Sequence, residues 1–112
     1  MKVTTTSSPF GSRTRTRVLL GLELLEDSHA RELARILGLA LSTVQKAIRS
    51  LELDGLVVGR SLGRTRSFRI NPGYFAAREL RRLTRRLAET DEDLRLRVGA
   101  RRSRPRRSGK PL

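Results

Sequence analysis

Three polar side chains with the chemistry of base recognition lie close together near the middle of the chain. Gln45 carries an amide that can pair with the edge of adenine, and Arg49 and Lys46 can reach guanine or phosphate. Ser42 and Thr43 precede them and carry hydroxyls that can donate to phosphate oxygens. We therefore predict that Ser42, Thr43, Gln45, Lys46 and Arg49 form a set that reads the bases of double-stranded DNA.

Two further basic groups predict contacts with the nucleic-acid backbone. Arg60, Arg64 and Arg66 flank a glycine-bearing loop, where arginine can follow the backbone or enter a minor groove. The last residues of the chain contain many arginines, a few prolines and serines and almost no apolar residue, so we expect a disordered basic tail that contacts phosphates. Its predicted contact residues are Arg101, Arg102, Arg104, Arg106, Arg107 and Lys110.

The overall charge supports a polyanionic partner. The chain has 25 basic and 11 acidic residues, a formal net charge of +14. Such a charge repels itself in a compact state and favours binding to nucleic acid first and to an anionic membrane surface second. The charge is uneven, since residues 42–72 and 98–112 are the electropositive parts.

Most other chemistries are excluded by what the chain lacks. There is no cysteine, which removes disulfides, thiolate metal sites and cysteine nucleophiles, and the single histidine, His29, cannot make a metal site alone. No phosphate-binding glycine loop or nucleophile motif is present, and the acids Asp91–Asp93 suit the start of a helix. We expect no enzyme activity, metal or cofactor. No apolar run is long enough for a membrane span or a signal peptide, so we expect a cytoplasmic protein.

Three helices and a hairpin position the predicted contacts. Apolar spacing predicts helices over 13–26, 30–37 and 41–53, with Gly38 ending the second. The third has one apolar face, Val44, Ala47, Ile48 and Leu51, which leaves the base-reading residues off that face. Short strands are predicted over 56–60 and 65–70, joined by a loop over 61–64.

A fourth helix is predicted over 74–88, followed by a short last helix that carries Leu94, Leu96 and Val98. The narrow leucine stripe of the helix over 74–88 is typical of helix pairing, and the first helix carries leucines on two faces. We therefore predict a homodimer held by Leu20, Leu24, Leu80, Leu83 and Leu87.

The predicted fold is mainly α with a small β-hairpin: a winged helix-turn-helix with an added C-terminal helix and a disordered basic tail. The expected organisation is a flexible arm over 1–12, the winged domain over 13–73, a helical dimerisation segment over 74–98 and the tail over 99–112.

From Phe10 to Tyr74 the chain resembles the winged helix-turn-helix domain of ArsR-like transcription regulators. The resemblance is carried by Arg31–Leu39, Ser42–Val44, Leu51–Val57 and Gly63–Pro72. It implies a DNA-binding regulator, although the cysteine pairs of the metal-sensing members are absent, and Ala40 and Leu41 stand where polar cap residues are expected.

The sequence thus predicts a dimeric, sequence-specific DNA-binding regulator that represses by steric occlusion. An alternative is a winged-helix partner or antitoxin of a nucleotidyltransferase-type enzyme, since Phe10–Arg13 resembles winged-helix domains found with such enzymes. A protein that coats RNA or chromatin is a third reading, but one tyrosine and three phenylalanines offer little surface for stacking on single strands.

Overall fold

The computed structural model describes residues 9–103, with the side chains described up to residue 100. The elements are α1 (Arg13–Leu25), α2 (Ala30–Leu37), α3 (Leu41–Leu53), β1 (Val57–Leu62), β2 (Thr65–Ile70), α4 (Ala77–Thr90) and α5 (Glu92–Ser103). This order confirms a mainly helical winged helix-turn-helix with added C-terminal helices.

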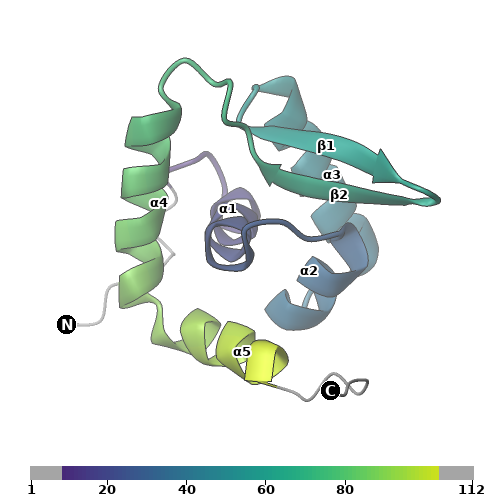
Figure 1. Ribbon diagram of the computed structural model, residues 1–112. Helices are drawn as coiled ribbons and strands as arrows, with labels where there is room; N and C mark the ends of the chain where they lie inside the picture. Colours follow the sequence, from purple (N-terminus) through teal and green to yellow (C-terminus); the bar gives the residue numbers. More distant parts are fainter. Residues whose placement is uncertain (1–8, 104–112) are drawn as a thin grey trace, which may run out of the picture.

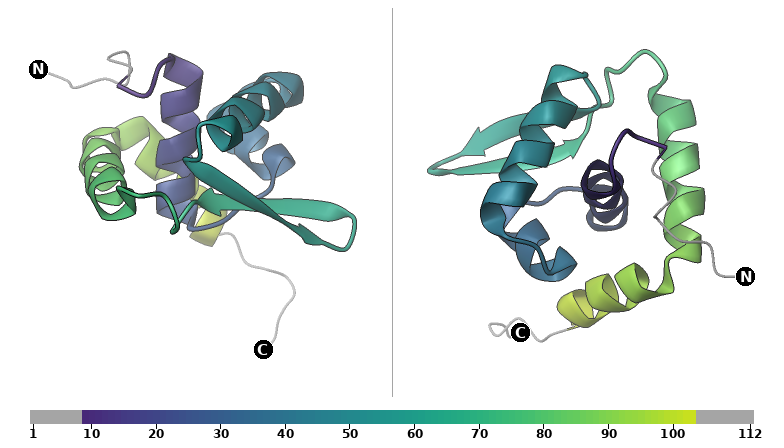
Figure 2. Two further views of the ribbon diagram at one scale, coloured as in Figure 1. Left: turned by 90° about the horizontal axis from the view of Figure 1, so that it is seen from above. Right: turned by 180° about the vertical axis from the view of Figure 1, so that it is seen from behind.

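Helix α1 is the centre of the molecule. Figures 1 and 2 show α2 and α3 on one side of it and α4 on the other side, and α5 lies along a third side, below α1 in Figure 1. Val18, Leu19 and Leu20 are fully buried in one core to which every helix contributes. A helix that is apolar on more than one face must be covered on more than one face. Here α2 and α3 pack on one apolar face of α1, and α4 of the same chain packs on the other.

The helix-turn-helix begins and ends where the apolar spacing predicts. Gly38 ends α2 in the left-handed conformation, with φ of 69°. His29 is the residue before α2, and its Nδ1 accepts a hydrogen bond from the backbone N–H of Glu32 at 3.2 Å. His29 is therefore a helix cap. Ala40 is the residue before α3, and its methyl group cannot make a side-chain cap hydrogen bond.

The hairpin is longer and its turn tighter than predicted. Strand β1 runs on to Leu62, which pairs with Thr65, so only Gly63 and Arg64 form the turn. Gly63 has φ of 66° at the first turn position, as a type II′ turn requires. Ser28 adds a single-residue bridge to Phe68, with backbone hydrogen bonds of 2.8 and 3.0 Å, and this bridge ties the hairpin to the loop between α1 and α2.

Helix α4 begins at Ala77 rather than Tyr74, because residues 71–77 form a turn closed by hydrogen bonds from the backbone N–H of Tyr74 to Asn71 O and from that of Ala77 to Tyr74 O. Its buried residues are Leu80, Thr84 and Ala88, which pack towards α1. The buried carboxylate of Glu23 on α1 accepts a hydrogen bond from Thr84 Oγ1 at 3.2 Å. Arg81 and Arg85 form ion pairs with the same carboxylate at 3.3 and 3.4 Å.

This packing corrects the expected dimer surface. Leu20 is fully buried and Leu80 is 7% exposed within one chain, and Leu24 and Leu87 are half-buried against the same core. Only Leu83, 44% exposed, is an exposed member of the predicted set. The second apolar face of α1 meets α4 of its own chain.

Helix α5 corrects the predicted start of the tail, since it continues to Ser103 and so includes residues 99–103. Asp91 Oδ1 accepts from the backbone N–H of Leu94 at the start of the helix, and Leu94 and Val98 anchor it in the core. Arg97 donates to Ile36 O at 3.1 Å and so ties α5 to the carboxyl end of α2. The remaining tail residues, among them Arg104, Arg106, Arg107 and Lys110, lie outside the described residues.

The carboxyl end of α2 is also met by Arg17, which donates to Leu37 O at 3.3 Å. Burial lowers the pKa of the Arg17 guanidinium from its usual value, an effect that the nearby Asp91 opposes. The guanidinium stays charged and complements the negative end of the α2 dipole.

The beginning of the described chain is not a free arm. Phe10 packs against the core, and its carbonyl oxygen accepts from Arg15 Nε at 2.6 Å. Among residues 9–103, no helix combines the length and apolar character needed to cross a bilayer.

Candidate nucleic-acid interface

Helix α3 has one buried and one exposed face. Val44, Ala47, Ile48 and Leu51 are buried against the core. The predicted base-reading residues Ser42, Thr43, Gln45, Lys46 and Arg49 are all exposed. A recognition helix needs this division, because its inner face must fix it while its outer face presents polar groups to a groove of DNA.

Helix α3 is also held at its carboxyl end. The guanidinium of Arg15 on α1 donates to Ser50 Oγ at 2.5 Å and to Asp54 Oδ2 at 2.7 Å. These two contacts hold the carboxyl end of α3 against α1 in addition to the apolar packing. The hydrogen bond from Arg15 Nε to Phe10 O orients the guanidinium that makes them.

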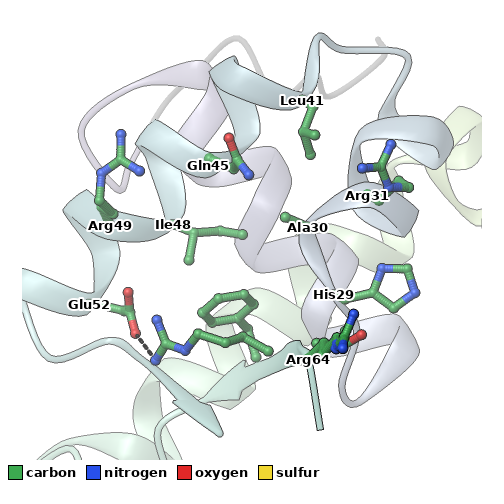
Figure 3. A pocket seen from close by; sticks show the side chains of 12 residues that line it. His29, Ala30, Arg31, Leu41, Gln45, Ile48, Arg49, Glu52 and Arg64 are labelled. Carbon is green, nitrogen blue, oxygen red and sulfur yellow. Dashed lines mark hydrogen bonds and ion pairs between the residues drawn. The ribbon is translucent and has the colours of Figure 1, made fainter. Parts of the chain in front are cut away.

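A groove of about 680 Å³ lies between α3, the start of α2 and the hairpin (Figure 3). We call it the α3–wing groove. Its lining is formed by His29, Ala30, Arg31, Leu41, Gln45, Ile48, Arg49, Glu52, Arg64, Thr65, Arg66 and Phe68. Four of these are arginines and one is an acid, so the groove is electropositive.

One contact spans the groove from helix to hairpin. Arg66 Nη2 lies 3.1 Å from Glu52 Oε2, and the Arg66 guanidinium carbon lies 5.0 Å from the centre of the Phe68 ring. Gly59 faces Phe68 across the hairpin, and a Cβ there would come 2.8 Å from Phe68 Cε1. The absence of that Cβ leaves room for the stacked Arg66–Phe68 pair.

The structure brings part of the predicted set together in the groove. Gln45 and Arg49 line it from α3, and Arg64 and Arg66 line it from the hairpin. Gln45, Arg49 and Arg64 make no side-chain hydrogen bond or ion pair with the described residues. These three are available to a ligand, whereas Arg66 is engaged by Glu52.

Other predicted residues lie outside the groove. Ser42, Thr43 and Lys46 are exposed on α3 but do not line it. Arg60 pairs with Ser67 in the hairpin register, one position from the Gly59–Phe68 pair, so it lies on the opposite face of the hairpin from Phe68. Arg60 therefore cannot share a contact in the groove with Arg66.

The sequence-based prediction missed Arg31 and Glu52 as groove residues. Arg31 stands in an acidic stretch of the sequence and gave no positional signal, but its place in the first turn of α2 brings it to the groove wall. Glu52 could have been paired with a wing arginine on charge alone. The partner could be chosen only from the hairpin register.

Residues 26–58 match a protein-family model described as winged helix-turn-helix DNA-binding. A comparison with curated proteins finds no match for the chain. The match runs from the end of α1 to the start of β1 and so contains α2, α3 and the turn between them. With the hairpin that follows α3, it shows that the chain carries a winged helix-turn-helix DNA-binding domain.

Proposed function

We propose that the chain is a sequence-specific, double-stranded DNA-binding transcription regulator of the ArsR-like kind. The observation that carries this proposal is the α3–wing groove, where Gln45 and Arg49 stand beside Arg31 and Arg64 on rigid elements. An amide and a guanidinium without partners in the described part of the chain have the donors and acceptors that base edges require.

The groove supports a division of work between base and backbone contacts. Gln45 and Arg49 project from α3, the helix that enters a major groove in this fold. Arg64 occupies the hairpin turn, and Arg31 lies in the first turn of α2, so both can reach the phosphates that flank the recognised bases. Lys46, Ser42 and Thr43 extend the contact surface along α3.

We propose repression by occlusion of the bound site, with two copies of the chain on a palindrome. One recognition helix contacts only a few base pairs, too few for a specific site, so two half-sites about 34–36 Å apart give the needed length. Since most of the predicted dimer leucines are covered within one chain, pairing is expected to form on the DNA.

Selection of bound sequences from a random duplex library tests this proposal. A two-fold symmetric consensus is expected, with half-site centres separated by one helical turn. Recovery of random sequences at the same affinity would reject sequence-specific recognition, and a consensus without symmetry would reject the paired arrangement.

A protein partner is the second candidate function, and two exposed apolar side chains favour it. Leu53 at the end of α3 is 88% exposed, and Phe75 before α4 is 91% exposed. Each of them is an apolar contact point that a partner protein could bury. Copurification with a nucleotidyltransferase-type enzyme that Phe75→Ser abolishes would support this role, and DNA binding by the isolated chain would show that such a partner is not required.

A further inference from the structure

A second basic surface lies on the side of the molecule away from the α3–wing groove. Arg78, Arg82 and Arg86 are exposed on α4 and recur every four residues, so they form one stripe. We call this stripe the α4 arginine face. It lies opposite the buried stripe of Leu80, Thr84 and Ala88, which packs towards α1.

The two basic surfaces are separated by the core. All views show α1 between α4 and the unit formed by α2, α3 and the hairpin (Figures 1 and 2). A straight duplex bound in the α3–wing groove therefore lies on the other side of α1 from the α4 arginine face.

The arginines of this face are not needed to hold the fold. Arg81 and Arg85, on the adjoining flank, bind the carboxylate of Glu23. Arg78, Arg82 and Arg86 make no ion pair or hydrogen bond with the described residues. Glu79 and Glu89 are the acids exposed on this helix, so its five arginines leave a net positive charge.

The chemistry of the face fits a phosphate backbone. Three arginines at this spacing extend over about 12 Å, a length over which duplex DNA presents about seven phosphates. No large apolar residue lies within the stripe, whereas a protein-binding surface has an apolar centre. Positive charge without an apolar centre therefore favours a phosphate backbone over an acidic protein.

We propose that the α4 arginine face binds the backbone of a second DNA segment, so that one protein bridges two duplexes. The inference rests on the proposed DNA binding in the α3–wing groove and adds a second, sequence-independent contact. Binding there should depend strongly on salt, because about three phosphate contacts give a slope near −2.7 in log K against log salt concentration.

A bridging assay tests the proposal with the full chain. One duplex that carries the selected site is immobilised, and a labelled duplex of random sequence is added with the protein. We expect the triple variant Arg78→Ala, Arg82→Ala, Arg86→Ala to recover at least about tenfold less label than the wild type. The matched variant with lysine at the same three positions keeps the charge and should still bridge.

Single-duplex binding and sedimentation are measured beside it. The alanine variant should bind one duplex within about threefold of the wild type, because charges across the core are screened over about 8 Å. Failure of the wild type to bind one duplex would reject the proposed function itself. Three results would overturn this inference. The wild type could bind one duplex normally without bridging, or the alanine variant could still bridge. Sedimentation could also show that the alanine variant loses bridging only because a dimer dissociates.

Discussion

Arginine has two different roles at the scale of single residues, and the partner of each side chain decides between them. Arg15, Arg81 and Arg97 bind carboxylates or helix-end carbonyls of their own chain. Arg49 and Arg64 line the α3–wing groove with no such partner among the described residues. Composition counts both groups as positive charge, but only the second lacks a partner among the described residues.

The first prediction concerns Gln45 and Arg49. Replacement of either by alanine should cost about 1–3 kcal/mol on the preferred site and relax the sequence preference at particular positions, because each removes base-edge contacts. Binding curves on the preferred site and on single-base variants measure both effects. Lys46→Ala is the comparison: Lys46 lies on the exposed surface of α3 but outside the groove, so its loss should weaken binding without a change in sequence preference. An equal loss of affinity by all three variants on every sequence would argue against base reading by Gln45 and Arg49.

The second prediction concerns Glu52, the acid of the groove. Glu52→Gln removes a negative charge beside the expected DNA and frees the Arg66 guanidinium. We expect tighter DNA binding by a few fold at low salt and a change in stability within about 1 kcal/mol, because the pair is exposed to solvent on the Arg66 side. Titration of duplex DNA at two salt concentrations checks this. Weaker binding would show instead that Glu52 holds Arg66 in its binding position.

The sequence located the residues of α3 but not all of their neighbours. Three- and four-residue spacing places Gln45 and Arg49 off the buried face without any knowledge of tertiary structure. Arg60 and Arg66 lie on opposite faces of the hairpin, and strand alternation gives this result for a two-residue turn as well as for the four-residue loop that was expected. Arg31 joins the groove only through the angle between α2 and the hairpin, and no local pattern encodes that angle.

At the scale of elements, local chemistry predicted α2 and α3 to the residue, and it predicted α4 and α5 but not the bounds of α4 or the length of α5. Gly38 marks the end of α2, and the apolar spacing of α3 marks its buried face, and both signals can be read from neighbouring residues alone. The start of α4 depends on the turn over 71–77, and the length of α5 depends on Leu94 and Val98 in the core. Tertiary packing decides these bounds, so the predicted tail began too early.

The caps of α2 and α3 give the third prediction. His29→Ala should destabilise the fold by about 1 kcal/mol, because the N–H of Glu32 loses its acceptor, and His29→Asn should restore most of that loss. Ala40→Ser should add up to about 1 kcal/mol, since Ala40 already has the extended backbone of a cap residue. Urea unfolding curves measure all three variants. Equal stability of the alanine and asparagine variants at position 29 would mean that the cap contributes nothing.

At the scale of the whole molecule, the leucines that indicated a dimer complete the core of one chain. The sequence shows that α1 has two apolar faces, and this remains correct. It does not show whether the covering helix belongs to the same chain or to a partner, because both supply the same apolar contacts. The Glu23 cluster with Thr84, Arg81 and Arg85 joins α4 to α1 of its own chain.

The last prediction tests whether the helix that packs on the second apolar face of α1 belongs to the same chain or to a second copy. Leu80→Asp would bury an unpaired carboxylate at a position 7% exposed and should cost about 3–5 kcal/mol, whereas the volume-conserving Leu80→Met should cost less than about 1.5 kcal/mol. Leu83→Asp, at a position 44% exposed, should stay within about 1 kcal/mol of the wild type. Urea unfolding at two protein concentrations gives these values, and sedimentation without DNA should give one species near 12.7 kDa. If Leu83→Asp instead halved the sedimenting mass of a wild-type dimer, α4 would be an interface between copies in solution as well as part of the core.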